Sequence, residues 1–313
     1  MNLGFVFPGQ GSQSLGMMAG FESLPAVRRT FDEAGAALAV DLWELVTSGP
    51  EEELNKTVNT QPVMLVAGVA LFRAWKELGG RDPILLAGHS LGEYSALVAA
   101  GVIEFADAVP LVRFRAQAMQ EAVPEGLGAI AAILGLDEEA VRSVCMEAAA
   151  AGVVEAANFN SPVQVVIAGE AAGVQRAIEL AKARGAKRAV LLPMSAPSHC
   201  SLMRPAAERL RERLAHTNLR RPLLRVINNV DAATEDAPER IRDALVRQLY
   251  HPVRWVETVR TLARSGVRQV VECGPGGVLT ALGKRTAPDL PIVAPKDAGE
   301  LQALATNTNG GTR

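Results

Sequence analysis

Ser90 is the residue whose type and setting most clearly suggest chemistry. It lies at the centre of Gly88-His89-Ser90-Leu91-Gly92, which has the pattern Gly-x-Ser-x-Gly. In such a turn between a strand and a helix, the serine adopts a strained backbone conformation and its hydroxyl points outward. Glycine is needed two residues to either side because a Cβ atom there would clash. The pattern predicts a nucleophile; the alternative is a tight turn whose serine only caps the following helix.

A serine becomes a nucleophile when a base lies within hydrogen-bonding distance of its hydroxyl. The chain has four histidines, His89, His199, His216 and His251. The ring of His89 should point away from the Ser90 hydroxyl because the two residues are adjacent at a sharp turn. His216 ends an arginine-rich helix that we expect to be exposed. We favour His199 as the base, although spacing alone leaves His251 open as well.

The segments beside the pentapeptide are of the kind that would present such a serine. Residues 84–87 are aliphatic and predict a short buried strand, and the apolar spacing after Leu91 predicts a helix. The N-terminus of that helix would place backbone N–H groups beside the Ser90 hydroxyl, where an oxyanion forms. These elements favour Ser90 as a nucleophile over Ser90 as a helix cap in a tight turn.

A second glycine-rich loop, residues 8–13 (PGQGSQ), follows a predicted strand at residues 3–7. The carboxyl edge of a parallel sheet is where α/β proteins build their sites. The loop lacks both the Gly-x-Gly-x-x-Gly spacing and the Gly-Lys-Ser/Thr ending of phosphate-binding loops. We therefore exclude nucleotide binding there.

The order of predicted elements divides the chain into two parts. Residues 125–193 predict the order strand, helix, strand, strand, helix, strand, which is that of a ferredoxin-like subdomain. Residues 1–124 and 194–305 predict a large, discontinuous α/β domain, similar to an α/β-hydrolase, with a short parallel sheet. The polar residues 306–313 (TNTNGGTR) predict a disordered tail.

Composition excludes several classes of function. The chain has 313 residues, enough for a large core, and its net charge of −2 argues against nucleic acid or an anionic membrane as partner. No apolar run approaches the ~20 residues that span a bilayer, and we see no secretory signal pattern. The three cysteines form no CxxC pair and no zinc spacing, which favours a reducing compartment. We expect a cytoplasmic protein.

Several segments, in one order along the chain, resemble the malonyl-CoA:acyl carrier protein transacylases of type II fatty acid synthesis. They are residues 5–13 (FVFPGQGSQ), 88–97 (GHSLGEYSAL), 115–120 (RAQAMQ), 158–162 (NFNSP), 197–200 (PSHC), 247–255 (RQLYHPVRW) and 272–282 (ECGPGGVLTAL). The resemblance covers essentially the whole chain except the tail. It implies that the protein moves the malonyl group of malonyl-CoA to the phosphopantetheine thiol of acyl carrier protein.

The resemblance also implies roles for individual residues. Ser90 would carry the acyl group, and His199 would be its general base and acid. The main-chain carbonyl of Gln248 would hold the imidazole in place of the usual triad carboxylate. The backbone amides of Gln10 and Leu91 would form the oxyanion hole.

Arg115 would, by the same resemblance, bind the free carboxylate of the malonyl group. A planar guanidinium meets a carboxylate with two parallel hydrogen bonds. Malonyl differs from acetyl by that one carboxylate, so this arginine would set the substrate class. The chain departs from the family pattern beside it, because Ala116 stands where the family usually has glycine.

The implied reaction exchanges one thioester for another, so we expect no metal, ATP or redox cofactor. Carrier proteins are acidic, which predicts a basic patch near the mouth of the site. We favour Lys284 and Arg285 for this patch; the alternative is the basic cluster at residues 182–188. We expect a monomer.

Other functions compete with this interpretation. A stand-alone acyltransferase of a polyketide synthase would share every residue named above. A serine esterase or thioesterase of the α/β-hydrolase kind shares the pentapeptide, but its histidine lies near the C-terminus, whereas a long stretch of this chain follows His199. A catalytically silent homologue is disfavoured by the presence of Ser90, His199 and Arg115 together.

Overall fold

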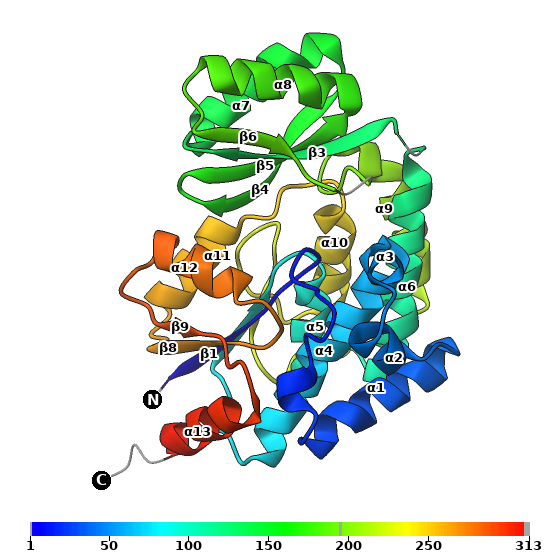
Figure 1. The fold of residues 1–313 in the computed structure, drawn as a ribbon, viewed down its shortest axis with the longest axis vertical. Helices are drawn as coiled ribbons and strands as arrows, with labels where there is room; N and C mark the ends of the chain where they lie inside the picture. The colour runs from blue at the N-terminus through cyan, green and yellow to red at the C-terminus, as the bar shows by residue number, and fades with distance from the viewer. Residues whose placement is uncertain (1, 125, 194–195, 310–313) are drawn as a thin grey trace.

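The computed structural model describes residues 2–124, 126–193 and 196–309. Within them the chain forms a larger α/β unit around a parallel sheet and a smaller unit around an antiparallel sheet (Figure 1). The fold class predicted from the sequence is confirmed. Residues 125 and 194 lie outside the described residues, so the proposed division at 1–124, 125–193 and 194–305 stays a prediction.

The parallel sheet contains the strands β1 (Leu3–Phe7), β2 (Leu85–Gly88), β7 (Val226–Ile227), β8 (Gln269–Glu272) and β9 (Ile292–Val293). Their spatial order is β7-β2-β1-β8-β9, and all the pairings are parallel. The strands β1 and β2 are buried along their whole length, as expected for a parallel sheet covered on both faces. Their carboxyl ends meet at one edge, which brings the loop after β1 beside Ser90.

The larger unit also contains the helices α1 (Pro25–Leu38), α2 (Leu42–Thr47), α3 (Glu51–Asn55), α4 (Thr57–Glu77), α5 (Gly92–Ala99), α6 (Phe105–Ala122), α9 (Arg204–Ala215), α10 (Pro238–Gln248), α11 (Trp255–Arg264), α12 (Val278–Thr286) and α13 (Ala298–Asn309). Short 3-10 helices lie at Ala19–Phe21 and Ser201–Met203. Helix α4 is the most central, because residues 60–72 are all buried against α1, α5 and α6. The core of the larger unit therefore supports both α5 and α6, which carry site residues.

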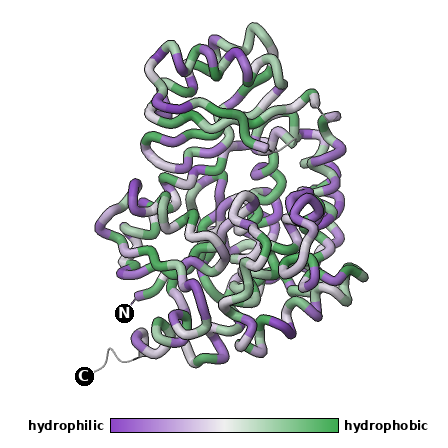
Figure 2. Tube along the Cα trace, viewed as in Figure 1, coloured by the Kyte–Doolittle hydropathy of each residue, from purple (hydrophilic) through white to green (hydrophobic). Residues whose placement is uncertain are grey.

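The smaller unit consists of β3 (Gly128–Leu134), α7 (Glu138–Ala148), a 3-10 turn (Ala149–Ala151), β4 (Val154–Ser161), β5 (Gln164–Glu170), α8 (Ala171–Ala183) and β6 (Arg188–Leu191). Its sheet order is β4-β5-β3-β6 with antiparallel pairing. Alternate residues of β3 face opposite ways: Ala131 and Ile133 pack with α7 and α8, and Ile130 and Ala132 face the other side. In Figure 2 the strands are mostly hydrophobic and these helices are mixed, as expected for helices with one exposed face.

The two units are joined along β4. Asn158 on this strand forms a parallel bridge with Val253, which lies after α10. The carboxylate of Glu155 accepts hydrogen bonds from the backbone N–H and the hydroxyl of Ser201, next to the segment of His199. The free face of the antiparallel sheet is thereby held over the carboxyl edge of the parallel sheet.

The end of the chain differs from the sequence prediction. Helix α13 extends to Asn309, so the predicted disordered tail is wrong for residues 306–309. Leu301 and Ala305 are buried, and the hydroxyl of Thr308 donates to the Ala305 carbonyl at 2.8 Å. Packing of the helix thus outweighs the weak helix propensity of the Thr-Asn run. Residues 310–313 lie outside the described residues.

Candidate active site

Ser90 occupies the turn between β2 and α5 with a φ of 51°, a left-handed conformation that is strained for a residue other than glycine. The backbone is closely packed around it. A Cβ atom added to Gly88 would lie 1.9 Å from the Gly92 carbonyl carbon, and one added to Gly92 would lie 2.0 Å from the Phe7 carbonyl oxygen. Both glycines are therefore required for this corner to form against β1.

Asn229 holds the corner from the side of β7. Its Oδ1 accepts a hydrogen bond from the Ser90 backbone N–H at 2.7 Å, and its Nδ2 donates to the Gly88 carbonyl at 2.6 Å. The side chain is fully buried, with a relative exposure of 0%. Sequence reasoning missed this residue. The available signal was an asparagine pair at the end of an apolar segment, residues 223–230 (LLRVINNV), because sites form where the strands of a parallel sheet end.

His199 lies within reach of the nucleophile. Its Nε2 is 2.7 Å from Ser90 Oγ, and its Nδ1 is 2.7 Å from the main-chain carbonyl oxygen of Gln248. A carbonyl only accepts hydrogen bonds, so Nδ1 carries the proton and Nε2 is free to accept the serine proton. Burial, reinforced by the Arg115 charge, lowers the pKa of His199 to about 3. The imidazole is thus held in its basic, neutral form.

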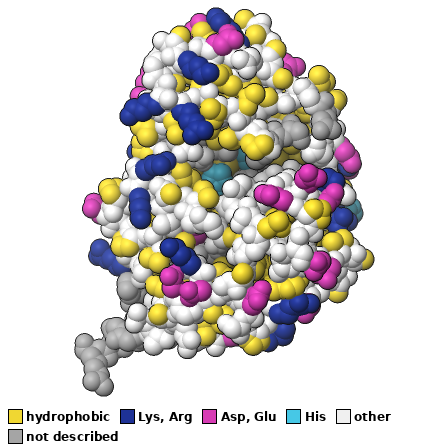
Figure 3. All heavy atoms as spheres, in the orientation of Figure 1, with side chains coloured by type: hydrophobic (Ala, Val, Ile, Leu, Met, Phe, Trp, Pro, Cys, Tyr) yellow, Lys and Arg dark blue, Asp and Glu magenta, His cyan; other side chains and the backbone are white. Residues whose placement is uncertain are grey.

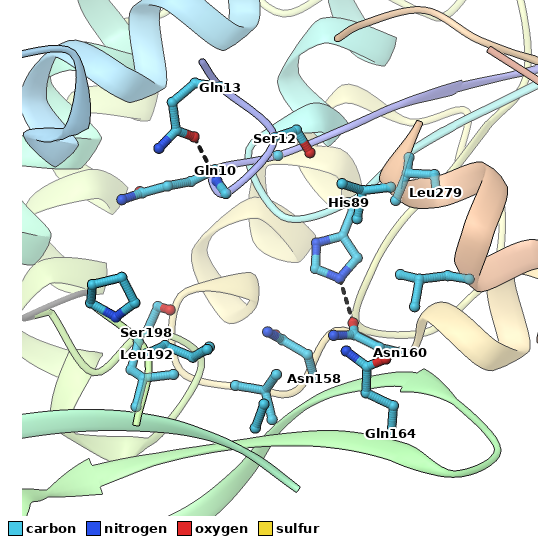
Figure 4. A pocket seen from close by; sticks show the side chains of 18 of the residues that line it. Gln10, Ser12, Gln13, His89, Asn158, Asn160, Gln164, Leu192, Ser198 and Leu279 are labelled. Atoms are coloured by element: carbon cyan, nitrogen blue, oxygen red, sulfur yellow. Dashed lines mark hydrogen bonds between the residues drawn. The ribbon is translucent and has the colours of Figure 1, made fainter. Parts of the chain in front are cut away.

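The other histidines lie away from the Ser90 hydroxyl. His251, which sequence reasoning had left open as the base, is exposed and contacts Tyr250 in a tilted arrangement, with 4.6 Å between ring centroids. His216 is exposed at the end of α9. His89 points toward β4, where its Nε2 lies 2.8 Å from Asn160 Oδ1 (Figure 4). Among the described residues, His199 is the histidine that the structure brings within hydrogen-bonding distance of Ser90 Oγ.

Arg115 projects from α6 to the same point and is only 1% exposed. Its Nη2 lies 3.3 Å from Ser90 Oγ and donates to Gln248 Oε1 at 3.0 Å, and its Nη1 donates to Gln61 Oε1 at 2.7 Å. Its carbon Cζ lies 5.5 Å from the centre of the Tyr94 ring. Among the described residues, Nε has no hydrogen-bond partner. The guanidinium thus faces the nucleophile and retains donor capacity for an anion.

Gln10 and Leu91 flank Ser90 on two sides; Gln10 lies in the loop after β1, and Leu91 lies at the start of α5. The chains approach closely here, because a Cβ atom on Gly9 would lie 2.5 Å from the His89 carbonyl oxygen. Within the described residues, neither the Gln10 nor the Leu91 backbone N–H donates a hydrogen bond. Both are available to an oxyanion, which the N-terminus of α5 also favours.

These groups enclose a cavity of about 50 Å³, which opens beside a larger pocket of about 510 Å³. The small cavity is lined by Gln10, Gln61, His89, Ser90, Leu91, Arg115, Met119, Asn158, Ser198 and His199. Both spaces share Gln10, His89, Asn158 and Ser198. Ser90 therefore lies at the inner end of a continuous cleft.

The larger pocket runs between the two units, and Figure 3 shows a hollow there with a histidine at its bottom. The face of β3 that carries Ile130 and Ala132 forms one wall, and α12 contributes Leu279. Amide side chains project into it, among them Asn158, whose Oδ1 has no hydrogen-bond partner within the described residues (Figure 4). Such a mixed lining suits a long ligand that carries both amides and methylenes.

Lys284 and Arg285 lie in the last turn of α12, and both are exposed. The Nη1 of Arg285 donates to Gln164 Oε1 at 3.1 Å, and Gln164 lines the larger pocket. In Figure 3, basic side chains gather to the left of the hollow and acidic ones to its right. Arg285 therefore contacts a residue of the pocket wall, and Lys284 precedes it in the same exposed turn.

Cys200, next to His199, is not a competing nucleophile. It is fully buried, and burial raises the pKa of its thiol to about 12. Within residues 2–124, 126–193 and 196–309, no cluster of His, Cys, Asp and Glu side chains is arranged to hold a metal ion. In the same residues, we find no helix with the length and apolar character that crossing a membrane requires.

Comparison with known proteins shows which chains resemble this one in sequence. Residues 4–307 match the family described as the acyl transferase domain. The malonyl CoA-acyl carrier protein transacylase of Escherichia coli (strain K12) is 55% identical over 300 residues, which cover 96% of this chain and 97% of that protein.

Solved structures of similar sequence have the same fold. The acyl-carrier-protein S-malonyltransferase of Burkholderia pseudomallei 1710b is 56% identical, with a TM-score of 0.96 and coverage of 98% of this chain and 100% of that one. A malonyl-transacylase solved in complex with its type II PKS acyl-carrier protein is 53% identical, with a TM-score of 0.96 and the same coverage.

Proposed function

Because the chain belongs to the acyl transferase domain family, we propose that it transfers the malonyl group of malonyl-CoA to the phosphopantetheine thiol of acyl carrier protein. One observation carries the proposal: the guanidinium of Arg115 lies 3.3 Å from the hydroxyl of Ser90, which is itself 2.7 Å from His199. A cation at this distance favours an acyl group that ends in a carboxylate.

In the first half-reaction, Ser90 Oγ attacks the thioester carbonyl of malonyl-CoA while His199 Nε2 takes the hydroxyl proton. The carbonyl of Gln248 keeps the proton on Nδ1 and stabilises the imidazolium. The oxyanion of the tetrahedral intermediate is bound by the N–H groups of Gln10 and Leu91. The C–S bond then breaks, the CoA thiolate receives the proton from His199, and a malonyl ester remains on Ser90.

In the second half-reaction, the carrier thiol attacks this ester as His199 removes the thiol proton. The C–O bond to Ser90 breaks, the serine oxygen regains the proton, and malonyl leaves as the new thioester. A thioester is thus exchanged for a thioester, with nearly balanced energy. We therefore propose that no metal, ATP or redox cofactor is required.

The carboxylate of malonate is the feature that Arg115 recognises. An acetyl group offers no partner, so the buried guanidinium loses the charge-assisted hydrogen bonds that malonyl supplies. Arg115→Ala should lower the preference for malonyl-CoA over acetyl-CoA by roughly 30- to 1000-fold, while relative activity on acetyl-CoA rises. The measurement is kcat/KM for both thioesters with one carrier protein. A preference that survives the substitution would refute the assigned role.

A second candidate function is acyl transfer to the carrier protein of a polyketide synthase. The solved complex of a 53% identical relative with a type II PKS acyl-carrier protein favours it. Both candidates use the same site, so only the carrier distinguishes them. Comparing kcat/KM for a fatty acid and a polyketide carrier protein, with malonyl-CoA held constant, decides between the two.

We place the docking surface for the acidic carrier protein at Lys284 and Arg285, because α12 lines the larger pocket and Arg285 contacts Gln164 at its wall. A phosphopantetheine arm that enters along this pocket would reach Ser90 at its inner end. We further propose that the protein works as a monomer in the cytoplasm.

A further inference from the structure

One buried carboxylate beside the site has no part in the mechanism above. Glu93 lies on α5, three positions after the nucleophile, and is only 2% exposed. Its Oε2 accepts hydrogen bonds from Gln248 Nε2 at 2.7 Å and from the Asn229 backbone N–H at 3.0 Å. Burying a carboxylate is unfavourable unless hydrogen bonds compensate for the lost hydration, so we ask what Glu93 does at this position.

The Glu93 carboxylate determines which way the Gln248 amide points. An ionised carboxylate only accepts hydrogen bonds, so the NH2 end of the amide must face it. That same Nε2 donates to the Ser90 carbonyl at 3.0 Å. The oxygen end is therefore turned toward Arg115, where Oε1 accepts from Nη2 at 3.0 Å. One amide thus connects Glu93 to the corner and to the guanidinium.

The hydrogen-bond acceptors of the guanidinium are neutral, namely the amide oxygens of Gln61 and Gln248 and the hydroxyl of Ser90. A carboxylate in direct contact would compete with the carboxylate of the substrate. A carboxylate one amide away balances part of the buried charge and leaves the guanidinium open. Glu93 stands at that distance along the hydrogen-bond chain.

We propose that Glu93 is a positioning residue for substrate selection: through the Gln248 amide it holds the Arg115 guanidinium beside Ser90, so that the acyl carboxylate becomes its direct counter-ion. The inference rests on the proposed function, because it supposes that Arg115 binds the malonyl carboxylate.

Titration of Glu93 supplies a second readout. Burial raises the pKa of Glu93 to about 7, although its hydrogen bond from Gln248 and the charge of Arg115 act to lower it. Among the described residues, two other carboxylates face it: Asp231 raises the pKa further, and Glu235 lines with Glu93 a separate cavity of about 10 Å³ on the side of β7 and α10. Its charge therefore changes near neutral pH, where His199 stays neutral.

Two variants test the proposal. Glu93→Gln retains an oxygen that accepts from Gln248 and Asn229 but removes the charge, and Glu93→Ala removes both. With kcat/KM measured for malonyl-CoA and acetyl-CoA, the malonyl preference should fall roughly 3- to 10-fold in Glu93→Gln and roughly 10- to 100-fold in Glu93→Ala. The loss should appear in the malonyl reaction, because acetyl makes no use of the guanidinium.

The matched control is Glu272→Gln. Glu272 is also a fully buried glutamate, but it lies on β8 and accepts hydrogen bonds from the backbone of Leu279 and Thr280. Its substitution removes a buried carboxylate without touching the Arg115 chain. It should change kcat/KM for the two thioesters by the same factor, as a general loss of stability would.

In the wild type, the malonyl preference should rise as pH increases through about 7 and Glu93 ionises. In Glu93→Gln it should stay flat at the low-pH value of the wild type. An unchanged preference in folded Glu93→Gln overturns the inference, and so do parallel pH profiles. Failure of the proposed function is a different result, namely an unchanged preference in Arg115→Ala.

Discussion

His199, the base that we propose, lies in surroundings that keep it deprotonated. The residue is 2% exposed, and its two ring nitrogens contact the Gln248 carbonyl and the Ser90 hydroxyl. A neutral imidazole is ready to take a proton without first losing one. The same surroundings have a consequence for stability, since the folded protein resists a protonation that the unfolded chain accepts.

We predict that this histidine weakens the protein at acid pH. The pKa of His199 is about 3 in the folded protein and 6.5 as the ordinary value, so between these values the unfolded chain binds the extra proton. The stability from the neutral ring is present above 6.5 and is lost as pH falls toward 3. In urea titrations at neutral and at mildly acidic pH, His199→Gln should lose less free energy of unfolding than the wild type. Equal losses would contradict the lowered pKa.

Residue types with distinctive chemistry were predictable from the sequence, and their supporting residues were not. Ser90 stands in a local pattern. Asn229 holds the Ser90 backbone from 139 positions away, and Gln61 meets Arg115 from 54 positions away. No local spacing marks such residues, because what makes them important is the folded proximity of distant segments.

At the scale of elements, the tight corner between β2 and α5 depends on close contact with β1. We predict that Gly92→Ala is destabilising by several kcal/mol, because its Cβ would lie 2.0 Å from the Phe7 carbonyl oxygen. Thermal unfolding and acyl transfer should both be impaired. The control is Gly299→Ala in the exposed start of α13, where the added Cβ meets only the Asp297 side chain, at 3.3 Å.

The control should be neutral or stabilising by up to about 1 kcal/mol, which is the usual gain when alanine replaces glycine in a helix. If Gly92→Ala behaved like this control, the close approach of the corner to β1 would be refuted.

Element order was predictable, but element length was less so. Residues 223–230 (LLRVINNV) have the apolar pattern of a strand, but they pair only at Val226–Ile227. Beyond that, Asn228 and Asn229 leave the ladder, and the Asn229 side chain binds the Ser90 corner instead. The apolar pattern of a segment predicts that it is buried and extended. The residue at which strand pairing ends depends instead on the neighbouring strand and on side chains, such as that of Asn229, that bind other parts of the chain.

At the scale of the whole molecule, the antiparallel sheet of the smaller unit forms one wall of the larger pocket. The segment GAIAAIL of β3 is apolar on both faces, so its pattern predicted burial but not what each face would contact. Ile133 faces the helices of its own unit, whereas Ile130 lines the larger pocket. The placement of the smaller unit over the site depends on contacts between units, such as Glu155 with Ser201, that no local pattern reveals.

Charge at the edge of this cleft leads to a prediction about the carrier protein. Reversing Lys284 and Arg285 to glutamate should raise KM for the carrier protein by roughly 10-fold and leave KM for malonyl-CoA unchanged. The effect should shrink at high salt, because exposed charges are screened. The comparison variant reverses Lys182 and Lys187 on the smaller unit. A larger effect of that variant would move the docking surface there.

The most direct test of the account is the mass of the protein after mixing with malonyl-CoA. We predict one malonyl adduct that peptide mapping places on Ser90, that disappears when holo acyl carrier protein is added, and that does not form in Ser90→Ala. An adduct that maps to another residue and is discharged to the carrier, or turnover without any acyl-enzyme, would contradict the account.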